Sequence, residues 1–85
     1  PQIVDLRSAE DFAKGTLPNA RNVPAAAMSA RLTELKKEKP VLLVCATGTS
    51  AGRTAALLRS QGFSDVFVLG GGVAAWREAG LPLRS

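Results

Sequence analysis

The sequence predicts an α/β fold of three layers, in which helices cover both faces of a mainly parallel sheet of four to five strands. Short apolar runs typical of buried strands, such as 41–44 and 66–69, alternate with segments that have the periodicity or end residues of helices. Such alternation joins parallel strands by right-handed crossovers. The chain, 1–85, is expected to form one domain, because a second would need about 50 residues for its own core.

The first quarter of the chain is expected to hold a strand, a short helix and a second strand. The apolar run 3–6 indicates the first strand. Ser8 is placed to cap a helix that has acidic residues in its first turn and ends at Gly15. Residues 16–19 have turn chemistry, and 20–23 are expected to form a brief strand.

A second helix is indicated by Met28, Leu32 and Leu35, which share one helical face, with Ser29 as a candidate N-cap. The basic stretch 31–39 is expected to be a solvated helix end. Nucleic-acid binding is disfavoured there, because no aromatic platform or recognised binding module accompanies the charges.

The middle of the chain predicts a strand over 41–44 that is buried on both faces. A helix is expected from about 51 to 61, because Gly62 follows as a stop. Its core stripe would consist of Ala51, Ala55 and Leu58.

The last part of the chain predicts another buried strand over 66–69 and a final helix. The glycines 70–72 are expected to form a tight turn between them, since no Lys-Ser/Thr pair follows as a phosphate loop requires. The final helix is expected to direct Val73, Trp76 and Ala79 into the core.

Composition excludes several classes of chemistry. One cysteine and no histidine rule out an internal disulfide, a zinc site of the usual type, and Ser-His-Asp or Cys-His catalysis. A net charge of +4 favours anionic partners. No run approaches the roughly 18 apolar residues of a membrane span. We expect a cytoplasmic location; a chain that opens at Pro1 without Met is compatible with an upstream anchor or signal.

The most informative candidate is Cys45, which follows the most apolar strand and precedes a helix. Ligands of parallel sheets bind beyond the carboxyl ends of strands, where backbone N–H groups and the helix dipole favour negative charge. The sulfur there should exist partly as the thiolate, the nucleophilic form. Gly48 allows the loop to curl its N–H groups around the sulfur, and the other candidate binding residues of the loop are Ala46, Thr47, Thr49 and Ser50.

Each of these candidates also has a purely structural interpretation. A lone cysteine is commonly a small buried hydrophobe, although the strand-Cys-loop-helix context favours function here. Asp5 and Arg7, at the carboxyl end of the first strand, are expected either to face the site or to pair with each other or with Glu10.

The order of short motifs along the chain resembles the rhodanese-like domain family. The resemblance runs nearly from end to end, and its motifs are Asp5-Leu6-Arg7, Glu10-Asp11-Phe12, Gly15-Thr16-Leu17-Pro18-Asn19-Ala20, Asn22-Val23-Pro24, the loop from Cys45 to Ser50, Gly62-Phe63, Val66 and Gly71-Gly72-Val73-Ala74-Ala75-Trp76. Family members usually begin with one more strand upstream, so this chain is expected either to lack an edge element or to have it trimmed.

The resemblance implies sulfurtransfer through Cys45. A sulfane sulfur from a donor such as thiosulfate would be held on the cysteine as a persulfide and passed to cyanide or a small or protein thiol. No metal or organic cofactor is implied. Active members often carry a basic residue at the position of Ala46 and an arginine at that of Ser50, and many have histidine at that of Thr16. Weak thiosulfate activity is therefore expected; Arg53, one helical turn beyond the loop, is a candidate supporting residue with Asp5 and Arg7.

Two other functions remain open at this point. The dual-specificity cell-cycle phosphatases, which are cysteine phosphatases, share the fold of this family, but they need an arginine six residues after the cysteine, where this chain has Ala51. A non-catalytic sensor or protein-interaction module that keeps the loop as a pocket is the stronger alternative, because fold alone does not carry activity.

Overall fold

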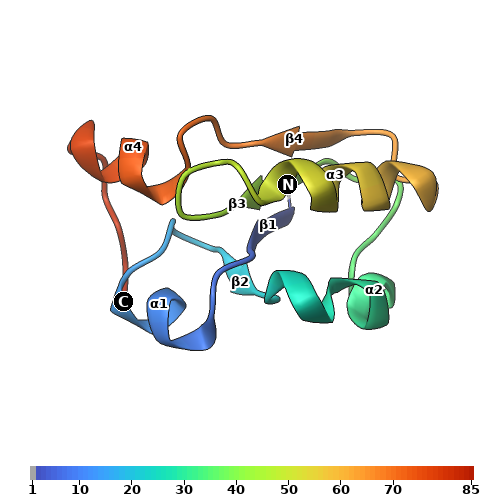
Figure 1. Cartoon of the computed structure of the whole chain (residues 1–85), viewed down its shortest axis with the longest axis horizontal. Helices are drawn as coiled ribbons and strands as arrows, with labels where there is room; N and C mark the ends of the chain where they lie inside the picture. Colours follow the sequence, from blue (N-terminus) through green and yellow to red (C-terminus); the bar gives the residue numbers. More distant parts are fainter. Residues whose placement is uncertain (1) are drawn as a thin grey trace.

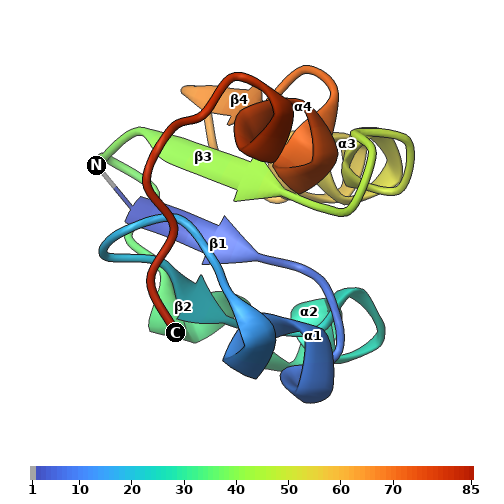
Figure 2. The same cartoon turned by 90° about the vertical axis from the view of Figure 1, so that its left-hand side faces the viewer.

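The sheet determines where the candidate residues lie. In the computed structural model, which describes residues 2–85 and leaves Pro1 outside, it has four parallel strands in the order β2-β1-β3-β4. The strands are β1 (Gln2–Asp5), β2 (Arg21–Asn22), β3 (Val41–Val44) and β4 (Val66–Val68). Figure 2 shows the two central strands, β1 and β3, side by side with their arrows pointing the same way. The predicted parallel sheet is confirmed, with four strands.

The helices follow the predicted alternation. They are α1 (Ala9–Lys14), α2 (Met28–Arg31) with the 3₁₀ helices η1 (Ala25–Ala27) and η2 (Leu32–Glu34) on either side, α3 (Ala51–Ser60) and α4 (Gly72–Glu78). The predicted cap of α1 is confirmed: the Ser8 hydroxyl accepts a hydrogen bond of 3.2 Å from the Asp11 N–H, and Gly15 closes the helix. None of the helices in the described residues has the length and apolar character needed to cross a bilayer.

Two hydrophobic clusters form, one on each face of the sheet. On the first face, Val4 of β1 and Leu43 of β3 pack with Met28 of α2 and with the apolar stripe of α3, and all these residues are buried. The predicted stripe Ala51, Ala55 and Leu58 is confirmed, and Thr54 is buried with it. On the second face Val44, Leu17 and Val73 form a smaller cluster, onto which Trp76 and the C-terminal segment pack.

The second face depends on extended chain as well as on a helix. In Figure 1 the C-terminal segment runs from α4 back toward α1. It pairs there with the segment after α1, because the backbone groups of Thr16 and Arg84 exchange two hydrogen bonds of 2.8 Å. The indole N–H of Trp76 donates to the Pro82 carbonyl at 2.7 Å, which fastens the same segment to α4.

Three details of the sequence prediction are wrong. The helical region around Met28 begins at Ala25, directly after Pro24, so Ser29 lies inside α2 and caps nothing. Strand β4 is an edge strand whose Phe67 is 57% exposed, because β4 pairs only with β3. Helix α4 ends at Glu78, which leaves Ala79 exposed.

Candidate functional site

The candidate site lies where β3 ends. Cys45 follows the last residue of β3, and a five-residue loop, 46–50, leads from it to the first residue of α3. Strand β1 ends level with β3, because Asp5 pairs in register with Val44. The carboxyl ends of the two central strands therefore meet at the edge of the sheet that carries the loop.

Cys45 is both buried and in contact with the loop. Cys45 is 4% exposed and belongs to the core cluster that contains Ala51. Its Sγ accepts a hydrogen bond of 2.9 Å from the backbone N–H of Gly48. Gly48 has a φ of +93°, which side chains with a Cβ rarely adopt, so a glycine at this position turns an N–H toward the sulfur.

The other loop residues lie toward solvent. Ala46, Thr47, Thr49 and Ser50 are exposed, and the hydroxyl oxygens of the two threonines lie 3.4 Å apart. Ser50 is the N-cap residue of α3, but its hydroxyl makes no capping hydrogen bond. Since no side chain of the described residues caps α3, the first N–H groups of this helix remain available to an anion.

The start of α4 forms a second part of the site, which the sequence analysis treated only as a turn. The N–H groups of Val73 and Ala74 donate to the carbonyl oxygens of Cys45 and Ala46 at 2.9 and 3.0 Å. Figure 1 shows the loop between β3 and α3 beside the first turn of α4. A Cβ on Gly72 would lie 2.2 Å from the Cys45 carbonyl oxygen, so the two backbones approach too closely for any side chain. The run of three glycines is the only trace of this contact in the sequence.

Arg53 lies beside the loop. A hollow of about 600 Å³ lies between η1 and α3, and its walls are Ala25, Ala26, Thr49, Ser50, Arg53, Thr54 and Leu57. We call it the loop hollow. Two loop residues and Arg53 thus share one cavity, which the position of Arg53 one helical turn beyond the loop did not reveal.

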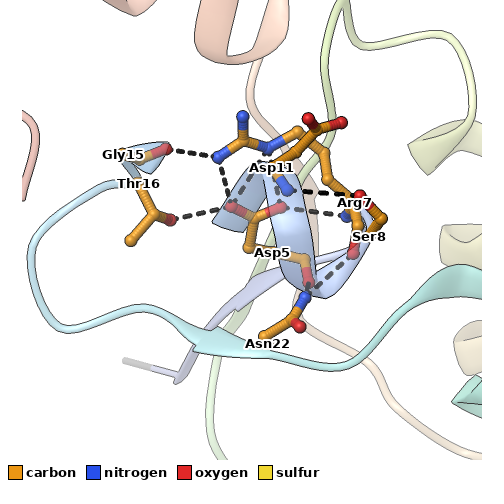
Figure 3. A network of polar contacts seen from close by, with 7 residues as sticks. All are labelled: Asp5, Arg7, Ser8, Asp11, Gly15, Thr16 and Asn22. Carbon is orange, nitrogen blue, oxygen red and sulfur yellow. Dashed lines mark hydrogen bonds and ion pairs between the residues drawn. The ribbon is translucent and has the colours of Figure 1, made fainter. Parts of the chain in front are cut away.

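Asp5 and Arg7 pair with each other rather than with Glu10. The Arg7 guanidinium contacts both carboxylate oxygens, with Nη2 2.8 Å from Oδ2 and Nε 3.1 Å from Oδ1. The Thr16 hydroxyl donates to Oδ2 at 2.8 Å, and Arg7 also donates to the Gly15 carbonyl (Figure 3). Asn22 donates to the backbone carbonyls of Asp5 and Arg7. These contacts join β1, β2 and the segment after α1, which is a structural role.

Asp5 is fully buried, and its ionisation is set by two opposing effects. Burial raises the pKa of the carboxyl group, but the hydrogen bonds from Arg7 and Thr16 outweigh it, so that the pKa lies below its ordinary value. The carboxylate is therefore charged at neutral pH and compensates the largely buried guanidinium.

The geometry defines a class of protein: a three-layer α/β domain with a cysteine at the carboxyl ends of its parallel strands, followed by a loop that directs the Gly48 N–H at the sulfur. Residues 1–79 match the family described as the rhodanese-like domain. A solved rhodanese-like domain from Anabaena sp. has a TM-score of 0.89 and 28% identity, and the match covers 99% of this chain and 98% of that one. The chain belongs to the rhodanese-like domain family.

Some relatives in this family are named as sulfurtransferases. The chain is 33% identical over 81 residues to the sulfurtransferase of Allochromatium vinosum, a match that covers 95% of this chain and 76% of that protein. It is 36% identical over 78 residues to the thiosulfate sulfurtransferase GlpE of Shewanella oneidensis, covering 92% of this chain and 77% of the relative.

Proposed function

We propose that this chain is a sulfurtransferase that carries sulfane sulfur as a persulfide on Cys45. The observation that carries the proposal is the hydrogen bond of 2.9 Å from the Gly48 N–H to the Cys45 Sγ, at the carboxyl edge of the sheet and at the start of α3. A glycine whose N–H points at a cysteine sulfur favours negative charge there, which both a thiolate nucleophile and a persulfide product require.

The proposed reaction has two steps. In the first, the Cys45 thiolate attacks the outer sulfur of thiosulfate, a new S–S bond forms, and sulfite leaves with the electron pair of the broken bond. In the second, a nucleophile such as cyanide or a thiolate attacks the outer sulfur of the persulfide and restores the Cys45 thiolate. Cyanide leaves as thiocyanate, and a thiolate leaves as its own persulfide. Neither step needs a metal or an organic cofactor.

The loop is suited to both anionic forms of Cys45, the free thiolate and the persulfide. In the free enzyme the Gly48 N–H donates to Sγ, and in the persulfide the added sulfur would extend toward the N–H groups of 46–50 and the start of α3. The backbone hydrogen bonds from α4 to the carbonyl oxygens of Cys45 and Ala46 keep the loop in place between the two steps. Because a carrier cysteine must stay reduced, the proposal includes a cytoplasmic location.

Intact-mass measurement after treatment with thiosulfate tests the proposal. We expect the protein to gain the mass of one sulfur atom, to lose it again on addition of cyanide, and to yield thiocyanate. The Cys45→Ala variant should gain nothing. A wild-type protein that takes up no sulfur from thiosulfate or polysulfide would contradict the proposal.

The second candidate is a non-catalytic sensor or protein-interaction module. Two observations favour it: Ser50 stands where active relatives often have arginine, and Cys45 is only 4% exposed. The same mass measurement separates the two functions, because a module that does not accept sulfur keeps its mass unchanged while a partner protein still binds the loop.

A further inference from the structure

The loop hollow contains a cation without a partner. Among the described residues, Arg7 pairs with Asp5, Arg21 and Arg31 pair with Glu34, and the Arg59 guanidinium donates to the Val66 carbonyl. Within the same part of the chain, the side chains of Arg53, Arg77 and Arg84 make no ion pair or hydrogen bond, and of these three only Arg53, which is exposed, lines the loop hollow.

The walls of the loop hollow are chemically suited to an oxyanion. They contain no carboxylate, so the charge of Arg53 is not neutralised locally. The hydroxyls of Thr49 and Ser50 line the same cavity, and Ser50 leaves the N-terminus of α3 uncapped. A guanidinium, hydroxyl donors and free helix N–H groups are the donors that proteins use for sulfonate-like and phosphate-like groups.

The position of Arg53 on the helix lets it act on the loop. It is the third residue of α3, and helical side chains incline toward the N-terminus and cover the preceding turn. The Arg53 side chain therefore extends toward Thr49 and Ser50, in agreement with their shared cavity. Cys45 directly precedes this five-residue loop, at the end away from α3, and is not itself among the walls of the hollow.

We propose that Arg53 is a donor-binding residue, which holds the oxyanion end of a sulfur donor in the loop hollow and so makes the site select anionic donors. The inference rests on the proposed function, since it names the substrate class of the same cysteine. It assigns to α3 the positive charge that Ser50 does not provide. A donor of the thiosulfate type would place its sulfonate oxygens against Arg53 and its outer sulfur toward Cys45.

The test compares two reactions of Cys45 in the wild type and in Arg53→Gln. The first is sulfur uptake from thiosulfate, followed by intact mass at low salt. The second is alkylation by iodoacetate, which is anionic, and by iodoacetamide, which is neutral and of nearly the same size. The ratio of the two alkylation rates reports the charge near the sulfur whether or not the protein transfers sulfur.

In Arg53→Gln we expect sulfur uptake from thiosulfate to fall about tenfold, which corresponds to the loss of one charge-assisted hydrogen bond. The iodoacetate rate should fall as well, while the iodoacetamide rate stays nearly unchanged. Arg53→Lys keeps the positive charge, so it should retain most of the thiosulfate uptake and most of the iodoacetate rate. Lys39→Gln removes the same charge from an exposed residue just before β3, at the amino ends of the strands, and should change neither reaction. Added salt should slow thiosulfate uptake in the wild type more than in Arg53→Gln.

The inference would be overturned by uptake from thiosulfate at the wild-type rate in Arg53→Gln, or by an equal fall in both alkylation rates. A fall equal to that of Lys39→Gln would also overturn it, because the effect would then come from net charge alone. If the wild type takes up no sulfur but Arg53→Gln still lowers the iodoacetate rate selectively, the proposed function fails and the anion site stands.

Discussion

The backbone N–H of Val73 donates a hydrogen bond of 2.9 Å to the carbonyl oxygen of Cys45. This hydrogen bond joins two segments nearly 30 residues apart in the chain. It holds the backbone of Cys45, the candidate nucleophile, against the start of α4. The close approach is permitted by Gly72, whose φ of +59° and missing side chain leave room for the carbonyl. The rigidity of the loop therefore depends on α4 as much as on α3.

Gly72→Ala is expected to disrupt the site and the fold together. A Cβ would lie 2.2 Å from the Cys45 carbonyl oxygen and 2.7 Å from two backbone atoms of Ala46, so both segments must move. We expect a loss of at least about 2 kcal/mol of unfolding free energy, roughly 10 °C in melting temperature for a domain of this size. Gly70→Ala is the control, since a Cβ there meets nothing within 4 Å. Equal melting temperatures for the two variants would show that the tight contact does not exist.

Gly48→Val is expected to impair sulfur uptake more than stability. Its φ of +93° is unfavourable for a β-branched residue, and a Cβ would lie 3.1 Å from the Gly71 nitrogen. The N–H would turn away from Cys45, and uptake should fall about tenfold, as expected for the loss of one hydrogen bond to an anion. Gly52→Ala, in an exposed and open position of α3, should melt slightly higher and react normally. Wild-type uptake in Gly48→Val would remove this N–H from the mechanism.

Acid stability should report the Asp5 carboxylate. Because its pKa is lower in the folded protein than in the unfolded chain, the ionised group stabilises the fold above about pH 4, and this contribution is lost as the pH falls through the folded-state pKa. Thr16→Val removes one hydrogen bond to the carboxylate, so its pKa should rise toward the ordinary value. Acid unfolding followed by circular dichroism should then begin at higher pH than in the wild type.

The matched control for this prediction is Thr33→Val, which changes an exposed threonine of η2. Its acid transition should coincide with that of the wild type. The Thr16→Val variant is also expected to lose about 1.5–3 kcal/mol at neutral pH, the range for hydrogen bonds to charged groups. Coincident acid transitions for both variants would mean that Thr16 does not stabilise the ionised Asp5.

Local sequence patterns predicted most of the fold because they depend on neighbouring residues. The apolar run at 41–44, the cap at Ser8 and the stop at Gly15 are read from a few adjacent positions, and all three hold in the structure. Burial of a strand depends instead on its neighbours in the sheet. The apolar run at 66–69 therefore indicated a strand, but could not show that it lies at an edge with Phe67 exposed.

The candidate site was likewise predictable only where it depends on residues that are neighbours in the sequence. The position of Cys45 between a strand and a helix is local information, and so is the need for glycine at 48. The long-range contacts were not predictable in this way: the hydrogen bond from Thr16 to Asp5, which joins β1 to the segment after α1, and the hydrogen bonds from α4 to Cys45 and Ala46, which hold the loop. The reach of Arg53 depends on how the loop turns at a positive φ, which the spacing in the sequence does not determine.

The last prediction concerns Ser50, which lines the loop hollow with Arg53. Ser50→Arg would add a second guanidinium beside the uncapped start of α3. If donor binding limits turnover, thiosulfate uptake should rise, and the gain should be larger in the Arg53→Gln background, where up to about tenfold is expected from one charge-assisted hydrogen bond. The two effects should not add, because both guanidinium groups bind the same anion. Ser60→Arg, which adds equal charge at the far end of α3, should leave uptake unchanged. A well-folded Ser50→Arg with no gain in either background would mean that positive charge beside the loop does not limit this protein, and that a step after donor binding does.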